Sequence, residues 1–64
     1  MTAPTLDLCE ITRADVRHDA PKPYLAVIVQ DGEGTEYRRN FEADANDDRI
    51  MEDFSRDWRN WRVI

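Results

Sequence analysis

The pattern of apolar and polar positions predicts a β-hairpin between Tyr24 and Phe41. The run YLAVIV at 24–29 is apolar at every position and rich in β-branched residues, which suits a central strand buried on both faces. The next segment, DGEG, carries two glycines that tolerate the positive φ angles of a tight turn. In the return strand, Tyr37 and Phe41 share one face and charged residues occupy the other. We therefore expect this return strand to lie at the edge of the sheet.

Another strand is predicted before the hairpin. Leu6 and Leu8 alternate with polar or small residues, and Ile11 falls on the opposite side, which indicates a bulge. If the strand continues to Val16, that residue rejoins the face of Leu6. A helix from Thr5 is the alternative, but its apolar residues would make a poor stripe. The following segment, 17–23, contains two prolines and is expected to be a stiff loop.

A helix is predicted from about Asp44 or Asn46 to Asn60. Its apolar positions recur at spacings of four, four and three, which places one stripe on one side of the helix and predicts that this stripe covers the sheet. The stripe consists of Ile50, Phe54, Trp58 and Trp61. We expect both tryptophans in the core, with Trp61 the more exposed of the two. The last two residues, Val63 and Ile64, either extend along the sheet or fray.

These elements predict one small α+β domain spanning residues 1–64. The expected order is β-β-β-α: an antiparallel three-stranded sheet with a C-terminal amphipathic helix packed on one face. Residues 1–4 are expected to form a flexible tether. A domain of 64 residues buries only about 60% of the surface of its unfolded chain, so we expect modest stability and no deep cleft.

Charge narrows the possible partners. The chain has 14 acidic and 9 basic residues and a net charge of −5, which argues against direct binding to nucleic acid or an anionic membrane. A basic protein is the better expectation. The sequence shows neither a run of about 20 apolar residues nor the layout of a signal peptide, and Cys9 is the only cysteine. We therefore expect a cytoplasmic location and no internal disulfide.

No motif predicts an enzyme, a metal site or a cofactor. The segment DANDD at 44–48 resembles the opening of an EF-hand loop, but Arg49 replaces the required glycine and Ser55 replaces the closing glutamate. Cys9 and His18 are two isolated ligand candidates, whereas a structural zinc site needs four. We therefore predict a non-enzymatic protein without metal or cofactor.

Acidic residues are concentrated in two stretches. Positions 42–53 hold six acids and one arginine, and the hairpin adds three more acids. One interpretation is an ordinary solvated surface. The other is an anionic surface that occupies a Lys/Arg groove built for phosphates, because carboxylates on a rigid scaffold can imitate the charge density of DNA. The candidate partner-binding residues are Asp31, Glu33, Glu36, Asp44, Asp47, Asp48, Glu52 and Asp53.

In size, acidity, low lysine content and expected element order, the chain resembles small phage anti-CRISPR proteins that inhibit type I effector complexes as DNA mimics. The resemblance implies a monomeric inhibitor whose partner is the PAM-reading large subunit of a type I Cascade complex, more narrowly the type I-C Cas8 subunit. The acidic residues would then block the DNA path. The alternative is a small adaptor or regulatory domain that docks through Tyr24, Tyr37 or an open sheet edge.

Overall fold

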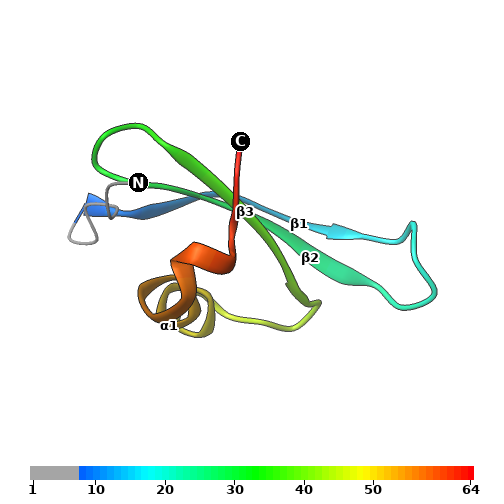
Figure 1. Ribbon diagram of the computed structural model, residues 1–64. Coiled ribbons are helices and arrows are strands. Elements are labelled where there is room, and N and C mark those ends of the chain that lie inside the picture. The colour runs from blue at the N-terminus through cyan, green and yellow to red at the C-terminus, as the bar shows by residue number, and fades with distance from the viewer. Residues whose placement is uncertain (1–7) are drawn as a thin grey trace.

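The computed structural model describes residues 8–64 and shows an antiparallel sheet with one helix on one of its faces (Figure 1). The predicted tether and Leu6 lie outside the described residues. The sheet has the strand order β1-β2-β3-β4. The elements are β1 (Glu10–Arg17), β2 (Tyr24–Gln30), β3 (Glu36–Glu42), α1 (Asp47–Asp57), the 3-10 turn η2 (Trp58–Asn60) and β4 (Arg62–Val63).

The α+β class, the antiparallel sheet and the covering helix agree with the sequence-based prediction. The predicted three strands and C-terminal helix are corrected, because a fourth strand follows the helix. In β4, Val63 pairs with Tyr37 and Arg62 pairs with Arg38, while the Ile64 amide donates to the Glu36 carbonyl at 3.0 Å. As a result, β3 is an inner strand and not the predicted edge.

Burial of Trp61 explains why the chain returns to the sheet. This side chain is only 4% exposed and packs against the rings of Phe41 and Phe54, with centroid distances of 5.4 and 5.0 Å. Because Trp61 is anchored beside β3, the next two residues lie within reach of that strand. The expectation that Trp61 would be more exposed than Trp58 is therefore wrong: Trp58 is the half-buried one.

The predicted bulge in β1 is present between Ile11 and Arg13. Ile11 lies opposite Val29, and after the bulge Ala14 lies opposite Val27. Directly opposed residues share a face, so the bulge keeps Ile11 and Ala14 on the side of the sheet that packs against α1. A strand without the extra residue would have turned one of them to the other side.

The hairpin turn forms where the glycines predicted it. The Asp31 amide donates to the Thr35 carbonyl at 3.0 Å, and the Gly34 amide donates to the Asp31 carbonyl at 3.1 Å. Gly34 has a φ of 86°, a left-handed conformation that residues with a Cβ rarely adopt. This turn therefore depends on glycine at position 34.

Helix α1 begins at Asp47 because Asn46 caps it. The Asn46 side chain accepts a hydrogen bond from the Arg49 amide at 2.8 Å, which satisfies one of the free donors of the first turn. Asp44 belongs to the preceding turn, where the Ala45 amide donates to the Glu42 carbonyl at 3.0 Å. The helix is thus shorter than predicted at both ends, since η2 follows after Asp57.

The core lies between α1 and the facing side of the sheet. Phe54 is fully buried and meets Tyr37 edge-on at 5.1 Å between ring centroids. The predicted inward face of β3 is confirmed, because Tyr37 and Phe41 are both in this cluster. The buried cluster comprises Leu25, Val27, Val29, Tyr37, Phe41, Ile50, Phe54 and Trp61. Within residues 8–64, no helix has the length and apolar character needed to cross a membrane.

Candidate functional site

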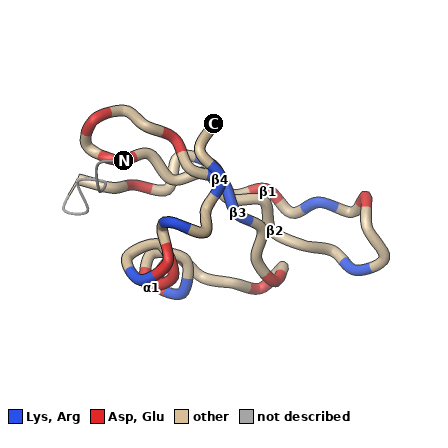
Figure 2. Tube along the Cα trace, in the orientation of Figure 1, with Lys and Arg blue, Asp and Glu red and all other residues tan. Residues whose placement is uncertain are grey.

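The eight predicted acids form two groups that lie apart along the chain and in space. The hairpin group, Asp31, Glu33 and Glu36, lies at and before the start of β3, whereas Asp44 follows its end and the other acids lie on α1. The seven residues of β3 place Asp44 about 20 Å from the hairpin group, whereas the later turns of α1 return toward the start of β3, since Phe54 meets Tyr37 at 5.1 Å between ring centroids. Figure 2 shows acidic positions on both the β2–β3 loop and the helix, on different parts of the molecule. They do not form one continuous surface.

Asp31 is used inside the hairpin turn. Its side chain is largely enclosed, with 6% of the residue exposed, and one carboxylate oxygen accepts hydrogen bonds from the Glu33 and Thr35 amides, each at 2.9 Å. Aspartate commonly closes turns in this way. Its carboxylate therefore holds the turn instead of facing a partner.

Asp53 is also internal, with 8% exposure. Its carboxylate accepts a hydrogen bond from Trp61 Nε1 at 2.9 Å and lies 3.2 Å from Arg39 Nη1 and 3.5 Å from Arg49 Nη1. The contact with Arg39 is an ion pair without hydrogen-bond geometry, and this buried nitrogen has no hydrogen-bond partner. Asp53 thus joins the helix to β3 and to the residue that precedes β4.

Two arginines of the helix, Arg49 and Arg56, form ion pairs with acids of this protein. Arg49 lies 3.4 Å from Glu42 and places its guanidinium carbon 5.3 Å from the centre of the Phe41 ring, in addition to its contact with Asp53. Arg56 pairs with Glu52 at 3.4 Å on the exposed side. Within residues 8–64, five of the predicted acids are exposed without an ion pair. They are Glu33, Glu36, Asp44, Asp47 and Asp48.

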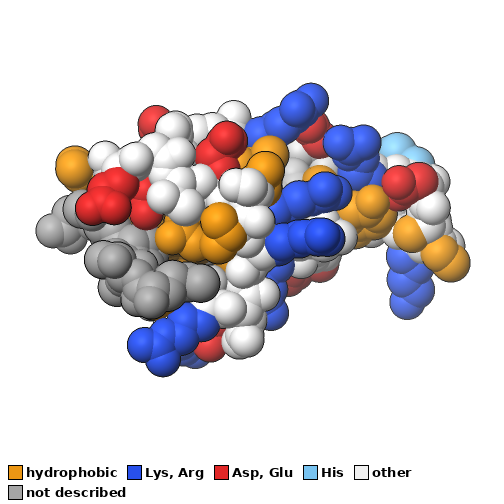
Figure 3. Space-filling view, turned by 45° about the horizontal axis from the view of Figure 1, so that its top comes forward, with side chains coloured by type: hydrophobic (Ala, Val, Ile, Leu, Met, Phe, Trp, Pro, Cys, Tyr) orange, Lys and Arg blue, Asp and Glu red, His pale blue; other side chains and the backbone are white. Residues whose placement is uncertain are grey.

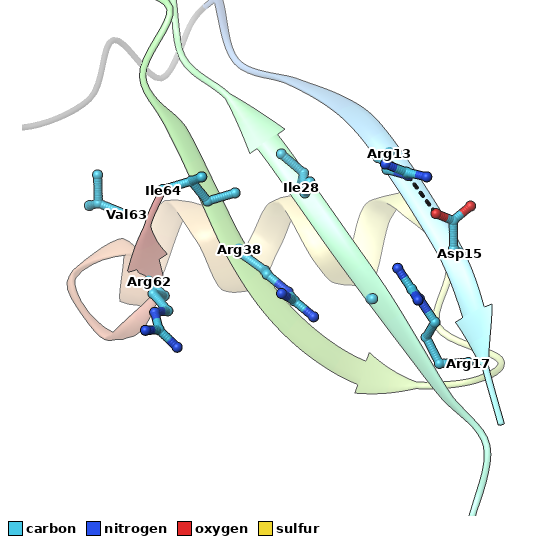
Figure 4. A pocket seen from close by; sticks show the side chains of 9 residues that line it. Arg13, Asp15, Arg17, Ile28, Arg38, Arg62, Val63 and Ile64 are labelled. Carbon is cyan, nitrogen blue, oxygen red and sulfur yellow. Dashed lines mark hydrogen bonds and ion pairs between the residues drawn. The ribbon is translucent and has the colours of Figure 1, made fainter. Parts of the chain in front are cut away.

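A second charged surface was not predicted. Four arginines extend from the side of the sheet opposite to α1: Arg13 and Arg17 from β1, Arg38 from β3 and Arg62 from β4 (Figure 4). We call these four residues the arginine face. Figure 3 shows Lys and Arg side chains gathered beside hydrophobic ones over the sheet. This surface is locally basic on a protein that is acidic as a whole.

The strand register sets three of these arginines in a row. Arg13 lies opposite Ile28, Ile28 lies opposite Arg38, and Arg38 lies opposite Arg62, so the row crosses all four strands. Arg13 has an acidic partner on this face, since its Nε lies 2.6 Å from Asp15. In the described part of the chain, the other three arginines form no ion pair.

The arginine face surrounds an open hollow of about 450 Å³. Ala26, Ile28 and Ile64 contribute the apolar part of its floor and rim. A second hollow of about 300 Å³ lies at the margin of β3 and is lined by Arg38, Arg39, Asn40 and Arg62. Arg38 and Arg62 therefore line both hollows.

The two tyrosines differ in their availability. Tyr24 lies at the end of the arginine face, opposite Arg17, and hydrogen bonding to Asp19 is the main cause that raises its pKa. Tyr37 is buried against Phe54, and this burial, reinforced by the charge of Asp31, raises its pKa. Of the two aromatic docking candidates, only Tyr24 is accessible.

The alternation of Arg13, Asp15 and Arg17 in the sequence was a signal for this face. It shows that two arginines share one side of β1, but it does not reveal which strands lie beside them. The juxtaposition of Arg38 with Arg62 depends on β4, and the sequence left open whether Val63 and Ile64 extend along the sheet or fray. The sequence therefore indicates that Arg13 and Arg17 share a side of their strand, but it does not show that Arg38 and Arg62 lie on the same face.

Guanidinium groups remain protonated in proteins and offer donors in a planar fork, so the arginine face is suited to binding anions and not to proton transfer. Among residues 8–64, no three His, Cys, Asp or Glu side chains lie together as a metal site would require. No protein family, curated protein or solved structure gives a significant match to the chain.

Proposed function

We propose that the protein is a non-enzymatic inhibitory module that binds a basic, nucleic-acid-binding protein as an anionic mimic of DNA. The observation that carries the proposal is a group of three exposed carboxylates at the start of α1 that form no ion pair with any of residues 8–64. We call Asp44, Asp47 and Asp48 the helix-start acids. Arg49 is the arginine that follows them in the sequence. It pairs with Glu42 and Asp53 and lies over the Phe41 ring, and it forms no ion pair with a helix-start acid.

The fold holds the helix-start acids firmly. Asn46 caps the helix between them, and Ile50 and Phe54 anchor the following turns in the core. Asp47 and Asp48 lie in the first turn, where the positive end of the helix dipole favours carboxylates. A partner would therefore meet charges that are already in place, with little loss of conformational entropy on binding.

The resemblance to anti-CRISPR proteins suggests the partner: the PAM-reading large subunit of a type I Cascade complex in a bacterial cytoplasm, with the type I-C subunit as the narrower choice. The helix-start acids would take the place of phosphates in its DNA groove. Glu33 and Glu36, at the hairpin, would form a second contact. Asp31 and Asp53 serve the fold, and Glu52 is paired with Arg56.

A competition experiment tests this proposal. Type I-C Cascade is titrated with a fluorescent duplex that carries a PAM, and anisotropy is followed as the protein is added. We expect the protein to displace the duplex, and this inhibition to weaken between about 50 and 300 mM salt, because surface charges are screened over this range.

The variant Asp47→Asn/Asp48→Asn should inhibit about tenfold less, which corresponds to the loss of a pair of charge contacts. Its matched control is Glu10→Gln/Asp57→Asn, which changes the net charge equally at sites away from the helix-start acids. The proposal would be wrong if the protein did not displace the duplex, or if the two variants lost inhibition equally.

A second candidate function is docking through the edge of the sheet. β1 is a terminal strand of eight residues, so its outer edge has no neighbouring strand in the described residues. Such an edge can accept a strand from a partner, although the bulge at Ile11 interrupts it. Partner binding that is insensitive to salt and survives Asp47→Asn/Asp48→Asn would favour edge docking over DNA mimicry.

A further inference from the structure

We propose that the arginine face is a docking surface for a short acidic segment of a partner protein. The inference concerns a different side of the molecule from the helix-start acids and does not depend on them. Its occupant is an extended stretch of a few residues that presents both carboxylates and apolar side chains on the side facing the sheet. Four features of this face support an acidic occupant: the strand register, the lack of ion pairs from residues 8–64 to three of its arginines, the acidic borders and the apolar floor.

Arg38 and Arg62 lie directly opposite each other on β3 and β4. Like charges directly opposite each other on neighbouring strands oppose the pairing of those strands. Two carboxylates lie in the neighbouring rows of this face: Asp15 is held by Arg13 at 2.6 Å, and Glu36, two residues before Arg38, forms no ion pair within residues 8–64. The fold therefore leaves two adjacent guanidinium groups without a counter-charge from residues 8–64.

A carboxylate from outside would remove this repulsion. A guanidinium group offers parallel N–H donors that match the two oxygens of a carboxylate. Arg38 and Arg62 line both hollows, so a side chain that enters either hollow reaches them. Binding an anion here is thus favoured twice, by the new contacts and by relief of a repulsion within the sheet.

The borders of the face limit the size of the occupant. In the next row toward the hairpin, Glu10 and Glu36 lie opposite Gln30 on its two sides, and at the other end Glu42 lies opposite Tyr24. A long polyanion laid along the strands would meet carboxylates at both ends. The arginine row itself crosses four strands, or about 14 Å, which is the length of four or five extended residues. These dimensions favour an acidic peptide over a nucleic acid strand.

The floor of the face explains why apolar residues belong in the occupant. Ile28 lies between Arg13 and Arg38 in the row, and Ile64 is 66% exposed at the rim of the hollow. An extended segment that carries carboxylates and apolar side chains on the same side can pair with the arginines and cover these isoleucines. Tyr24 is the aromatic residue on this face, and its place at the far end offers little base stacking to a nucleic acid.

The test uses the whole protein labelled with ¹⁵N and two probes of equal length: an octapeptide of two Glu-Glu-Val-Val repeats, which carries both residue types on each side of an extended chain, and oligothymidylate. We expect the peptide to shift the amide signals of Ile28, Arg38 and Arg62 saturably at low salt. The variant Arg38→Gln/Arg62→Gln should bind it about tenfold more weakly, as the loss of charge-assisted hydrogen bonds predicts. Arg56→Gln/Arg59→Gln, which changes the net charge equally on the helix side, should bind it normally.

Several results would overturn the proposal. These are the absence of saturable shifts, equal weakening in both arginine variants, or tighter binding of oligothymidylate than of the peptide at this face. Circular dichroism shows whether each variant is folded, and the single variant Arg38→Gln replaces the double variant if the latter is not. Asp47→Asn/Asp48→Asn should bind the peptide normally, so this experiment can fail or succeed independently of the DNA-mimic proposal.

Discussion

The two faces of the sheet have opposite chemistry. The face toward α1 is closed by aromatic and aliphatic side chains, with Phe54 fully buried between Tyr37 and Trp61. The other face carries the arginine face around Ile28. Both faces come from the same strands, since successive residues point to opposite sides. On β3, for example, Tyr37 and Phe41 contribute to the core while Arg38 contributes to the charged surface.

This difference teaches where function is to be sought. Substitutions on the closed face change packing, so its residues are explained by stability alone. On the open face, the opposition of Arg38 and Arg62 works against the pairing of β3 and β4. A feature that costs stability is not explained by folding. It points instead to a contact made outside the protein.

The largest expected effect comes from the closed face. Phe54→Ala should lower the free energy of unfolding by about 3–5 kcal/mol, because it leaves a cavity between two rings, and this approaches the whole stability of a small domain. Chemical denaturation measures the change. Ile28→Ala, on the open face, is the control and should cost about 1 kcal/mol. Similar losses at the two positions would mean that the faces do not differ as described.

A smaller loss of stability is expected from Asp53, the buried carboxylate at the margin of the closed face. Asp53→Ala should lower the free energy of unfolding by about 2–4 kcal/mol, because Trp61 Nε1 loses its acceptor and Arg39 loses its partner. Asp53→Asn retains an oxygen that can accept from Trp61 Nε1, so this variant should lose less free energy of unfolding than Asp53→Ala. Denaturation of both variants separates the two contributions.

The exposed pair on the same helix is the control for Asp53. Glu52→Ala removes only the contact with Arg56 and should cost less than about 0.5 kcal/mol. A loss at Glu52 equal to that at Asp53 would contradict the internal role of Asp53.

The closed face was largely predictable from the sequence. The continuous apolar, β-branched run of β2 predicted a central strand, and the spacing of Ile50 and Phe54 predicted the buried side of α1. The hairpin turn followed from its glycines. The sequence left undecided whether Val63 and Ile64 join the sheet, because a strand of two residues is too short to show a period and the position of β4 depends on the burial of Trp61.

The charged sites were less predictable because aspartates look alike in a sequence. Asp31 and Asp53 were grouped with the surface acids, yet both lie inside the fold. A signal existed for Asp31, since aspartate before a glycine-rich turn commonly binds its own backbone. No local signal marked Asp53, because its partners Arg39 and Trp61 come from other elements. The arginine face likewise depended on strand register.

The smallest expected effect tests the open face directly. Arg62→Gln should raise the free energy of unfolding by about 0.5 kcal/mol at low salt, because it removes the repulsion with Arg38 while keeping a long side chain on β4. Arg17→Gln changes the net charge equally but lies opposite Tyr24, so it should not stabilise the protein. The gain should shrink near 1 M salt, where charges are screened within about 3 Å. Denaturation of both variants at two salt concentrations measures the difference. If Arg17→Gln stabilised the protein as much as Arg62→Gln, the effect would come from overall charge and not from the opposed arginines.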